Sequence, residues 1–274
     1  MPKSSRGGKA GTTTTFTLRQ PQYHPVTNPR PTPQAAPQPV QQPVQQQPPI
    51  QQNQPSASYD AFRKMTDDQK ADVIMQARNT QVPIFLAQND LQRVLYGLKL
   101  NDKPTLVDDS VLDSMPGKSL YRTVNATNDP TNRMKYGADE VANQVLRGSV
   151  TRVSDTGGSV YGRGIYFADD YRDSVSYGNR SGNIKQTAVI RTKLSPTAKT
   201  IDVWKADSAA MNEISSGSKL GKALSKLQVK DQSAVWALAK GYDAMVAKNG
   251  YHVIINRSAL IASKDIKPTG SKWK

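Results

Sequence analysis

Apolar residues follow a helical period over residues 59–100, and shorter, mixed periods follow after residue 118. In the first segment they recur every three or four positions, which places them on one face of a helix. Pro83 interrupts the pattern and predicts that a second helix begins there, because proline is well tolerated at the first helical position. We therefore expect a helical segment, bounded at residues 59–114.

The pattern from residue 115 onward predicts an α+β domain over residues 115–274. Lys248-Asn249-Gly250 favours a hairpin turn between the last two expected strands, and Gly148 is a helix stop signal. Because helices and strands alternate poorly, we expect antiparallel pairing. The expected strands are 119–124, 149–153, 163–168, 186–194, 200–204, 242–247 and 252–256, and the expected helices are 138–147 and most of 207–240.

Residues 1–58 have a different composition, dominated by Pro, Gln, Thr and Ser, with a low-complexity core at residues 38–55. Such a composition has too few apolar side chains to bury a core. We therefore predict a disordered Pro/Gln-rich tail over these residues, which specifies no chemistry of its own.

Residues 162–178, GRGIYFADDYRDSVSYG, combine the strongest chemical signals in the chain. Side chains alternate as in a two-faced strand up to Ala168, and two aspartates then favour a helix start. The strand presents Tyr166, and the helix presents Ser174 and Tyr177 on one face. Two rings and a hydroxyl around one spot suit a cationic aromatic such as nicotinamide, and two core tyrosines with satisfied hydroxyls are the open alternative.

This block resembles, nearly position for position, the signature of ADP-ribosyltransferases on the poly-ADP-ribose polymerase branch, of bacterial or phage type. The resemblance is close over residues 162–178 and looser over about residues 115 to 268. It implies an α+β fold with split antiparallel sheets, preceded here by the helical segment, and NAD as the substrate. It also implies that Tyr166 and Tyr177 sandwich nicotinamide, that Ser174 bonds its carboxamide, and that Gly164 keeps the strand backbone accessible.

The resemblance implies a dinucleotide anchor on an early strand, where this chain has Arg122 and Thr123. Some members of the superfamily have Arg at this position, whereas the polymerase-like branch has His. The planar fork of Arg122 suits a phosphate or ribose, and an ordinary surface arginine at a strand end is the alternative.

The third motif of these enzymes is where the chain departs from the pattern. They commonly place a Glu just before a hydrophobic strand near the end of the domain, and the position we match to it is Tyr251. Tyr251 therefore joins Arg122 and Tyr166 as the candidate catalytic residues. The lost carboxylate argues against chain elongation, and Asp243 is the closest substitute, although a structural role explains it equally well.

These features predict a glycosyltransferase, an NAD-dependent mono-ADP-ribosyltransferase that acts on a macromolecular acceptor, either a protein, which we favour, or a nucleic acid. A catalytically silent NAD-binding module or a virion-associated structural module is the alternative, because the expected Glu is missing. A basic nucleic-acid-binding protein is the third, since the formal net charge is +15. That reading explains the charge but not the tyrosine block.

Composition excludes several other classes of site and location. The chain has no cysteine, which rules out disulfides and thiolate metal sites, and with two histidines no metal site is expected. No apolar run reaches the ~18 residues of a membrane span, and no signal-peptide pattern is present. We expect no membrane association and no Sec export, and a location in the host cytoplasm or in a virion.

Overall fold

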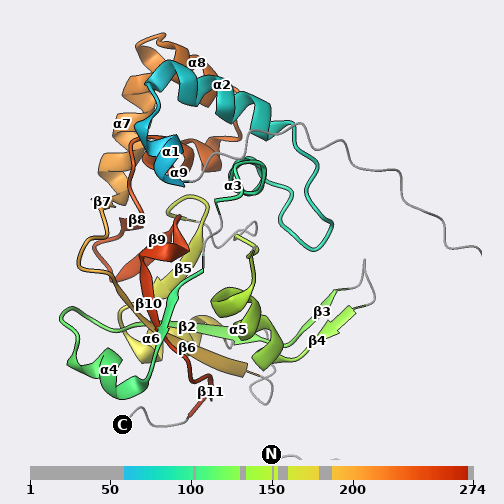
Figure 1. Ribbon diagram of the computed structural model, residues 1–274, viewed down its shortest axis with the longest axis vertical. Coiled ribbons are helices and arrows are strands. Elements are labelled where there is room, and N and C mark those ends of the chain that lie inside the picture. The colour runs from blue at the N-terminus through green and yellow to red at the C-terminus, as the bar shows by residue number, and fades with distance from the viewer. Residues whose placement is uncertain are drawn as a thin grey trace, which may run out of the picture. The chain divides into compact units, whose positions relative to one another are not determined.

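The computed structural model describes residues 59–100, 103–129, 134–149, 151–153, 160–178 and 187–270. The tail predicted over residues 1–58 lies outside these ranges, and so do residue 150 and residue 186 of two predicted strands. Within the described ranges the fold is α+β, with helices packed on a nine-stranded mixed sheet (Figure 1).

Local signals set most helix boundaries as the sequence predicts. The helix expected to begin at Pro83 begins at Asp90 instead, because Asn89 caps it by accepting a hydrogen bond from the Gln92 amide at 2.8 Å. Residues 105–107 of the expected helical segment form a strand and not a helix. The helices are α1 (Tyr59–Lys64), α2 (Asp67–Arg78), α3 (Asp90–Gly97), α4 (Asp109–Ser114), α5 (Ala138–Arg147), α6 (Tyr171–Gly178), α7 (Val203–Ser215), α8 (Lys219–Leu224) and α9 (Val229–Ala239).

Six of the seven expected strands form, whereas β1, β3, β4, β10 and β11 were not predicted from the sequence. Residues 151–153 form no strand, and the strand expected at 200–204 ends at Asp202, whose carboxylate caps the following helix. The strands are β1 (Thr105–Val107), β2 (Leu120–Asn125), β3 (Thr127–Asp129), β4 (Met134–Tyr136), β5 (Ile165–Ala168), β6 (Thr187–Leu194), β7 (Thr200–Asp202), β8 (Ala244–Val246), β9 (Tyr251–Ile254), β10 (Leu260–Ser263) and β11 (Lys267–Pro268).

The main sheet runs in the order β1-β10-β6-β2-β5-β9-β8-β7, with β11 also paired to β6. Pairing is antiparallel except for β1 with β10 and β7 with β8, so the sheet is mixed and not purely antiparallel. The strands β3 and β4 form a separate hairpin. The predicted turn at residues 248–250 joins β8 to β9 as an antiparallel hairpin.

The sheet is nearly divided between β2 and β5. These strands share a single residue pair, Tyr121 with Ala168, whereas β2 pairs with β6 over six residues. Beyond that one pair the two strands diverge, and α6 packs against both of them. A pocket lies at this division.

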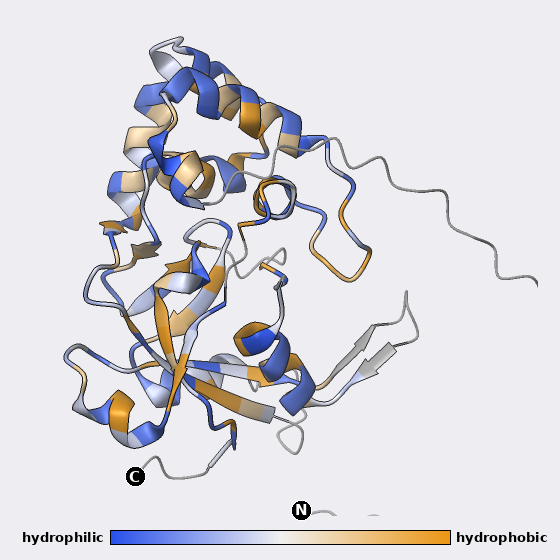
Figure 2. Ribbon diagram, in the orientation of Figure 1, coloured by the Kyte–Doolittle hydropathy of each residue, from blue (hydrophilic) through white to orange (hydrophobic). Residues whose placement is uncertain are grey.

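The helices of residues 59–114 and those of residues 115–274 share one core with the sheet. The helix α2 packs against α3 and α8, and β1 pairs with β10, so the predicted segments 59–114 and 115–274 contribute to the same compact unit. Figure 2 shows the hydrophobic residues gathered along the central strands. None of the helices in the described ranges combines the length and the apolar character needed to cross a membrane.

Candidate functional site

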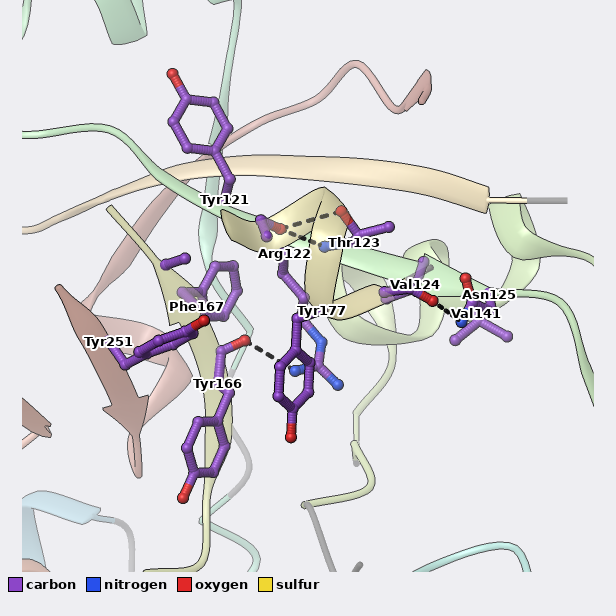
Figure 3. A pocket seen from close by; sticks show the side chains of 13 residues that line it. Tyr121, Arg122, Thr123, Val124, Asn125, Val141, Tyr166, Phe167, Tyr177 and Tyr251 are labelled. Carbon is purple, nitrogen blue, oxygen red and sulfur yellow. Dashed lines mark hydrogen bonds between the residues drawn. The ribbon is translucent and has the colours of Figure 1, made fainter. Parts of the chain in front are cut away.

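A pocket of about 280 Å³ opens where β2 and β5 separate (Figure 3). Its walls come from β2, α5, β5, α6 and the start of β9. The volume lies just below the range of about 300–1,000 Å³ that is typical of small-molecule sites. It brings together six of the residues singled out in the sequence: Arg122, Thr123, Tyr166, Ser174, Tyr177 and Tyr251.

Short contacts hold α6 against β2 and so shape the pocket wall. The Ser174 hydroxyl accepts a hydrogen bond from the Thr123 amide at 2.8 Å and lies 3.1 Å from the Thr123 hydroxyl. The side-chain amide of Asn125 donates a hydrogen bond to the Gly178 carbonyl at 2.6 Å. Gly178 permits this approach, because a Cβ there would lie 2.5 Å from Thr123 Cγ2. The Ser174 hydroxyl is therefore fixed in position before any ligand arrives.

Arg122 places its guanidinium inside the pocket. Its Nη1 donates to the Tyr166 carbonyl at 2.8 Å, while its buried Nε has no hydrogen-bond partner among the described residues. No carboxylate among the described residues lies within ion-pair distance of the Arg122 guanidinium. Burial lowers the pKa of Arg122 to about 10. The group remains charged at neutral pH and has an unused donor, which is a good arrangement for binding an anion.

The tyrosines of the pocket differ in how firmly they are held. The Tyr166 hydroxyl donates to the Gly162 carbonyl at 2.5 Å and accepts from the Tyr161 amide at 3.2 Å, and burial raises its pKa. Tyr177 is 41% exposed and packs against Tyr251 with ring centres 6.3 Å apart. Tyr166 is thus a fixed wall, whereas Tyr177 and Tyr251 lie at the open side.

The turn into β5 is anchored from the helical side of the fold. The Arg163 amide donates to the Lys230 carbonyl at 3.1 Å, and its guanidinium lies 3.8 Å from the carboxylate of Asp231 in α9. Asp231 is fully buried, and desolvation raises its pKa to about 6 despite the opposing charge of Arg163. The contacts of Arg163 with α9 therefore fix the backbone just before Tyr166.

Gly164 is not among the residues that line the pocket. A Cβ at this position would lie 2.4 Å from Val253 Cγ1 and 3.1 Å from the Ile254 carbonyl. The missing side chain therefore allows β5 to approach β9, and it does not serve ligand access as the resemblance implied.

We predict that Gly164→Ala lowers the free energy of unfolding by about 2 kcal/mol or more, because the new methyl group overlaps Val253. Urea denaturation of both proteins measures the difference. Gly137→Ala is the matched control, since a Cβ there meets nothing within 4 Å. Equal losses in the two variants would contradict the close approach.

Asp243, the suggested substitute for the missing Glu, lies outside the pocket. It is 3% exposed and accepts hydrogen bonds from Arg63 at 2.6 Å, from Asn256 at 2.7 Å and from the Lys199 amide at 2.8 Å. These contacts tie α1 to the sheet, so the role of Asp243 is structural. Tyr251 does line the pocket, and no Asp or Glu is among the lining residues.

Several lining residues were not singled out from the sequence. They are Tyr121, Val124, Asn125, Val141, Phe167, Ala168 and Gly178. Tyr121 and Asn125 flank the predicted anchor Arg122 on β2, and strand alternation was the only local signal for them. Val141 comes from α5, and nothing in the sequence connects that helix to the pocket.

Comparison of the chain with protein-family models, curated proteins and solved structures finds no match. Across the ranges that the structure describes, no group of three or more His, Cys, Asp or Glu side chains is placed to hold a metal ion. The side chains that line the pocket offer aromatic rings, hydroxyls, the Asn125 amide and the Arg122 guanidinium.

Proposed function

We propose that this pocket binds NAD and that the chain is a mono-ADP-ribosyltransferase. The observation that carries the proposal is the Arg122 guanidinium, which has no acidic partner in the described chain and lies in one pocket with Tyr166, Ser174 and Tyr177. The rings and hydroxyl suit the flat cationic nicotinamide, and the guanidinium suits the adjoining phosphates. The nine strands form one continuous sheet and not the split sheets that the resemblance implied, although only one residue pair joins β2 to β5 beside the pocket.

In the proposed reaction a nucleophile of the acceptor forms a bond to C1′ of the nicotinamide ribose. The bond from C1′ to nicotinamide breaks, nicotinamide leaves as a neutral molecule, and the acceptor proton passes to water. Arg122 would hold the phosphates and Ser174 the carboxamide, so placement accounts for most of the rate enhancement. NAD is a substrate here and not a resident cofactor.

A second candidate function is NAD binding without transfer, and one observation favours it. The pocket has no lining carboxylate to stabilise the positive charge that develops on the ribose. The same observation supports transfer of a single ADP-ribose over chain elongation. The two functions share the binding site and differ only in the chemical step.

Incubation of the full chain with labelled NAD and host-cell lysate distinguishes the two functions. We expect label transfer by the wild type and none by the Tyr166→Ala, Arg122→Ala double variant. NAD binding measured by calorimetry without any transfer would establish the silent module. Absence of both binding and transfer would reject the proposal.

A carboxylate introduced at Tyr251 should accelerate the chemical step. We predict that Tyr251→Glu raises the rate of nicotinamide release from NAD by about 10-fold or more, because the new charge lies on the pocket wall. Nicotinamide release is followed by chromatography at neutral pH. Tyr251→Gln is the matched control, since it removes the same ring and adds no charge, and equal rates for the two variants would contradict the prediction.

A further inference from the structure

Four aromatic side chains form a continuous row that begins in the pocket and leaves it. Ring centres lie 6.3 Å apart for Tyr177 and Tyr251, 6.3 Å for Tyr251 and Tyr161, and 6.4 Å for Tyr161 and Trp204. We call these four residues the aromatic strip. Only Tyr177 and Tyr251 line the pocket, so the outer half of the strip has no part in the site described above.

The outer end of the strip is exposed, and it is carried by a backbone that is fixed in place. Trp204 is 58% exposed, although burial of its large ring would be favourable. It lies in the first turn of α7, where the Asp202 carboxylate accepts hydrogen bonds from the Trp204 and Lys205 amides at 3.0 and 3.1 Å. Tyr161 is held by a hydrogen bond of 2.6 Å from the Asn249 side chain to its hydroxyl. These contacts fix the backbone at Trp204 and the hydroxyl of Tyr161 before a partner arrives.

Lysines occur in each segment that carries or holds the strip. Lys205 follows Trp204, and Lys248 precedes Asn249. The Lys230 carbonyl accepts a hydrogen bond from the Arg163 amide, two residues after Tyr161. The side chains of all three lysines are exposed. Asp202 opposes them but is engaged in capping α7. The whole chain carries a formal net charge of +15. Partly or fully exposed rings in segments that also carry exposed lysines are a combination with which proteins bind single-stranded nucleic acids.

We propose that the aromatic strip binds a single-stranded nucleic acid and leads one of its nucleotides to the pocket as the acceptor. Bases would stack on Trp204 and Tyr161, and the lysines would face the phosphates. The acceptor role rests on the proposed function: a nitrogen or oxygen of the strand bonds to C1′ of NAD, nicotinamide leaves, and the proton passes to water. Binding by the strip does not depend on that reaction.

Binding of fluorescein-labelled single-stranded DNA and RNA 12-mers to the full chain, in the absence of NAD, tests the strip. We expect Trp204→Ala to weaken binding of the preferred oligonucleotide about 10-fold, and Trp204→Phe to retain most of the affinity. Met211→Ala is the matched control on the same helix, since Met211 is 51% exposed and apolar but does not belong to the strip. Affinity should also fall steeply as salt is raised.

Absence of oligonucleotide binding, or equal binding by wild type and Trp204→Ala, would overturn the proposal. Labelling of a protein that depends on Trp204, without oligonucleotide binding, would also overturn it and would assign the strip to a protein acceptor. In a second arm, NAD is added and the oligonucleotide mass is measured, with a gain of one ADP-ribose expected. Strip-dependent binding with no mass gain would remove the acceptor role and leave the strip as a binding surface, so the two proposals fail separately.

Discussion

Arg122→Met is expected to weaken NAD binding by about 100-fold, which corresponds to the loss of a buried charge-assisted contact to phosphate. The free energy of unfolding should change by less than about 1 kcal/mol. The variant loses the hydrogen bond to the Tyr166 carbonyl, but it also loses a partly buried charge that has no acidic partner among the described residues, and the two effects offset each other. An arginine kept for structure would show the opposite pattern, with loss of stability and unchanged binding.

Ligand fragments make the test of Arg122 specific. ADP-ribose carries the phosphates and should lose affinity as NAD does, whereas nicotinamide alone should bind the variant as it binds the wild type. Calorimetry with the three ligands measures both effects. Arg172→Met, an exposed arginine on α6, is the control for a change in overall charge. Equal weakening of nicotinamide and ADP-ribose would show that Arg122 shapes the pocket and does not hold phosphate.

The local sequence was sufficient to bring three residues of the pocket together but not to predict the rest of its lining. Strand alternation and helical spacing brought Tyr166, Ser174 and Tyr177 to one pocket, because a short strand followed directly by a capped helix has few arrangements. Arg122 was placed there by the family resemblance. Val141, and the Tyr161 and Trp204 rings of the strip, come from segments whose approach depends on long-range packing. No local pattern predicts such contacts.

The errors in the fold prediction have both local and long-range causes. Pro83 and the apolar pair Ile84 and Phe85 indicated a helix start, but those two side chains are 64% and 49% exposed, and the cap at Asn89 decides the boundary. The pairing of β1 with β10 joins Thr105 to Ile261 in parallel, and nothing near either strand in sequence indicates it. Asp243 looked equally suited to catalysis and to structure until its donors from α1 were located.

Arg257→Met is expected to cause the largest loss of stability among single substitutions considered for this chain. Arg257 is fully buried and donates to the carbonyls of Val145 at 2.5 Å and Gly148 at 2.8 Å, at the end of α5. The last carbonyls of a helix have no partner within it, and a guanidinium there also opposes the negative end of the helix dipole. Methionine fills the space but leaves these carbonyls buried without donors, at a cost of about 1–3 kcal/mol each.

The total loss for Arg257→Met should therefore be about 3 kcal/mol or more, measured by urea denaturation. Arg147→Met is the matched control: Arg147 also bonds a carbonyl, that of Lys264 at 3.1 Å, but on the surface, so its loss should cost less than about 1 kcal/mol. Arg257→Met should also speed amide exchange along α5, because the end of that helix loses its donors, while β8 and β9 remain protected. The change would reach the pocket through Val141, which α5 contributes to its lining. A loss no greater than that of Arg147→Met would show that water or a local rearrangement satisfies the carbonyls, and that the end of α5 does not depend on Arg257.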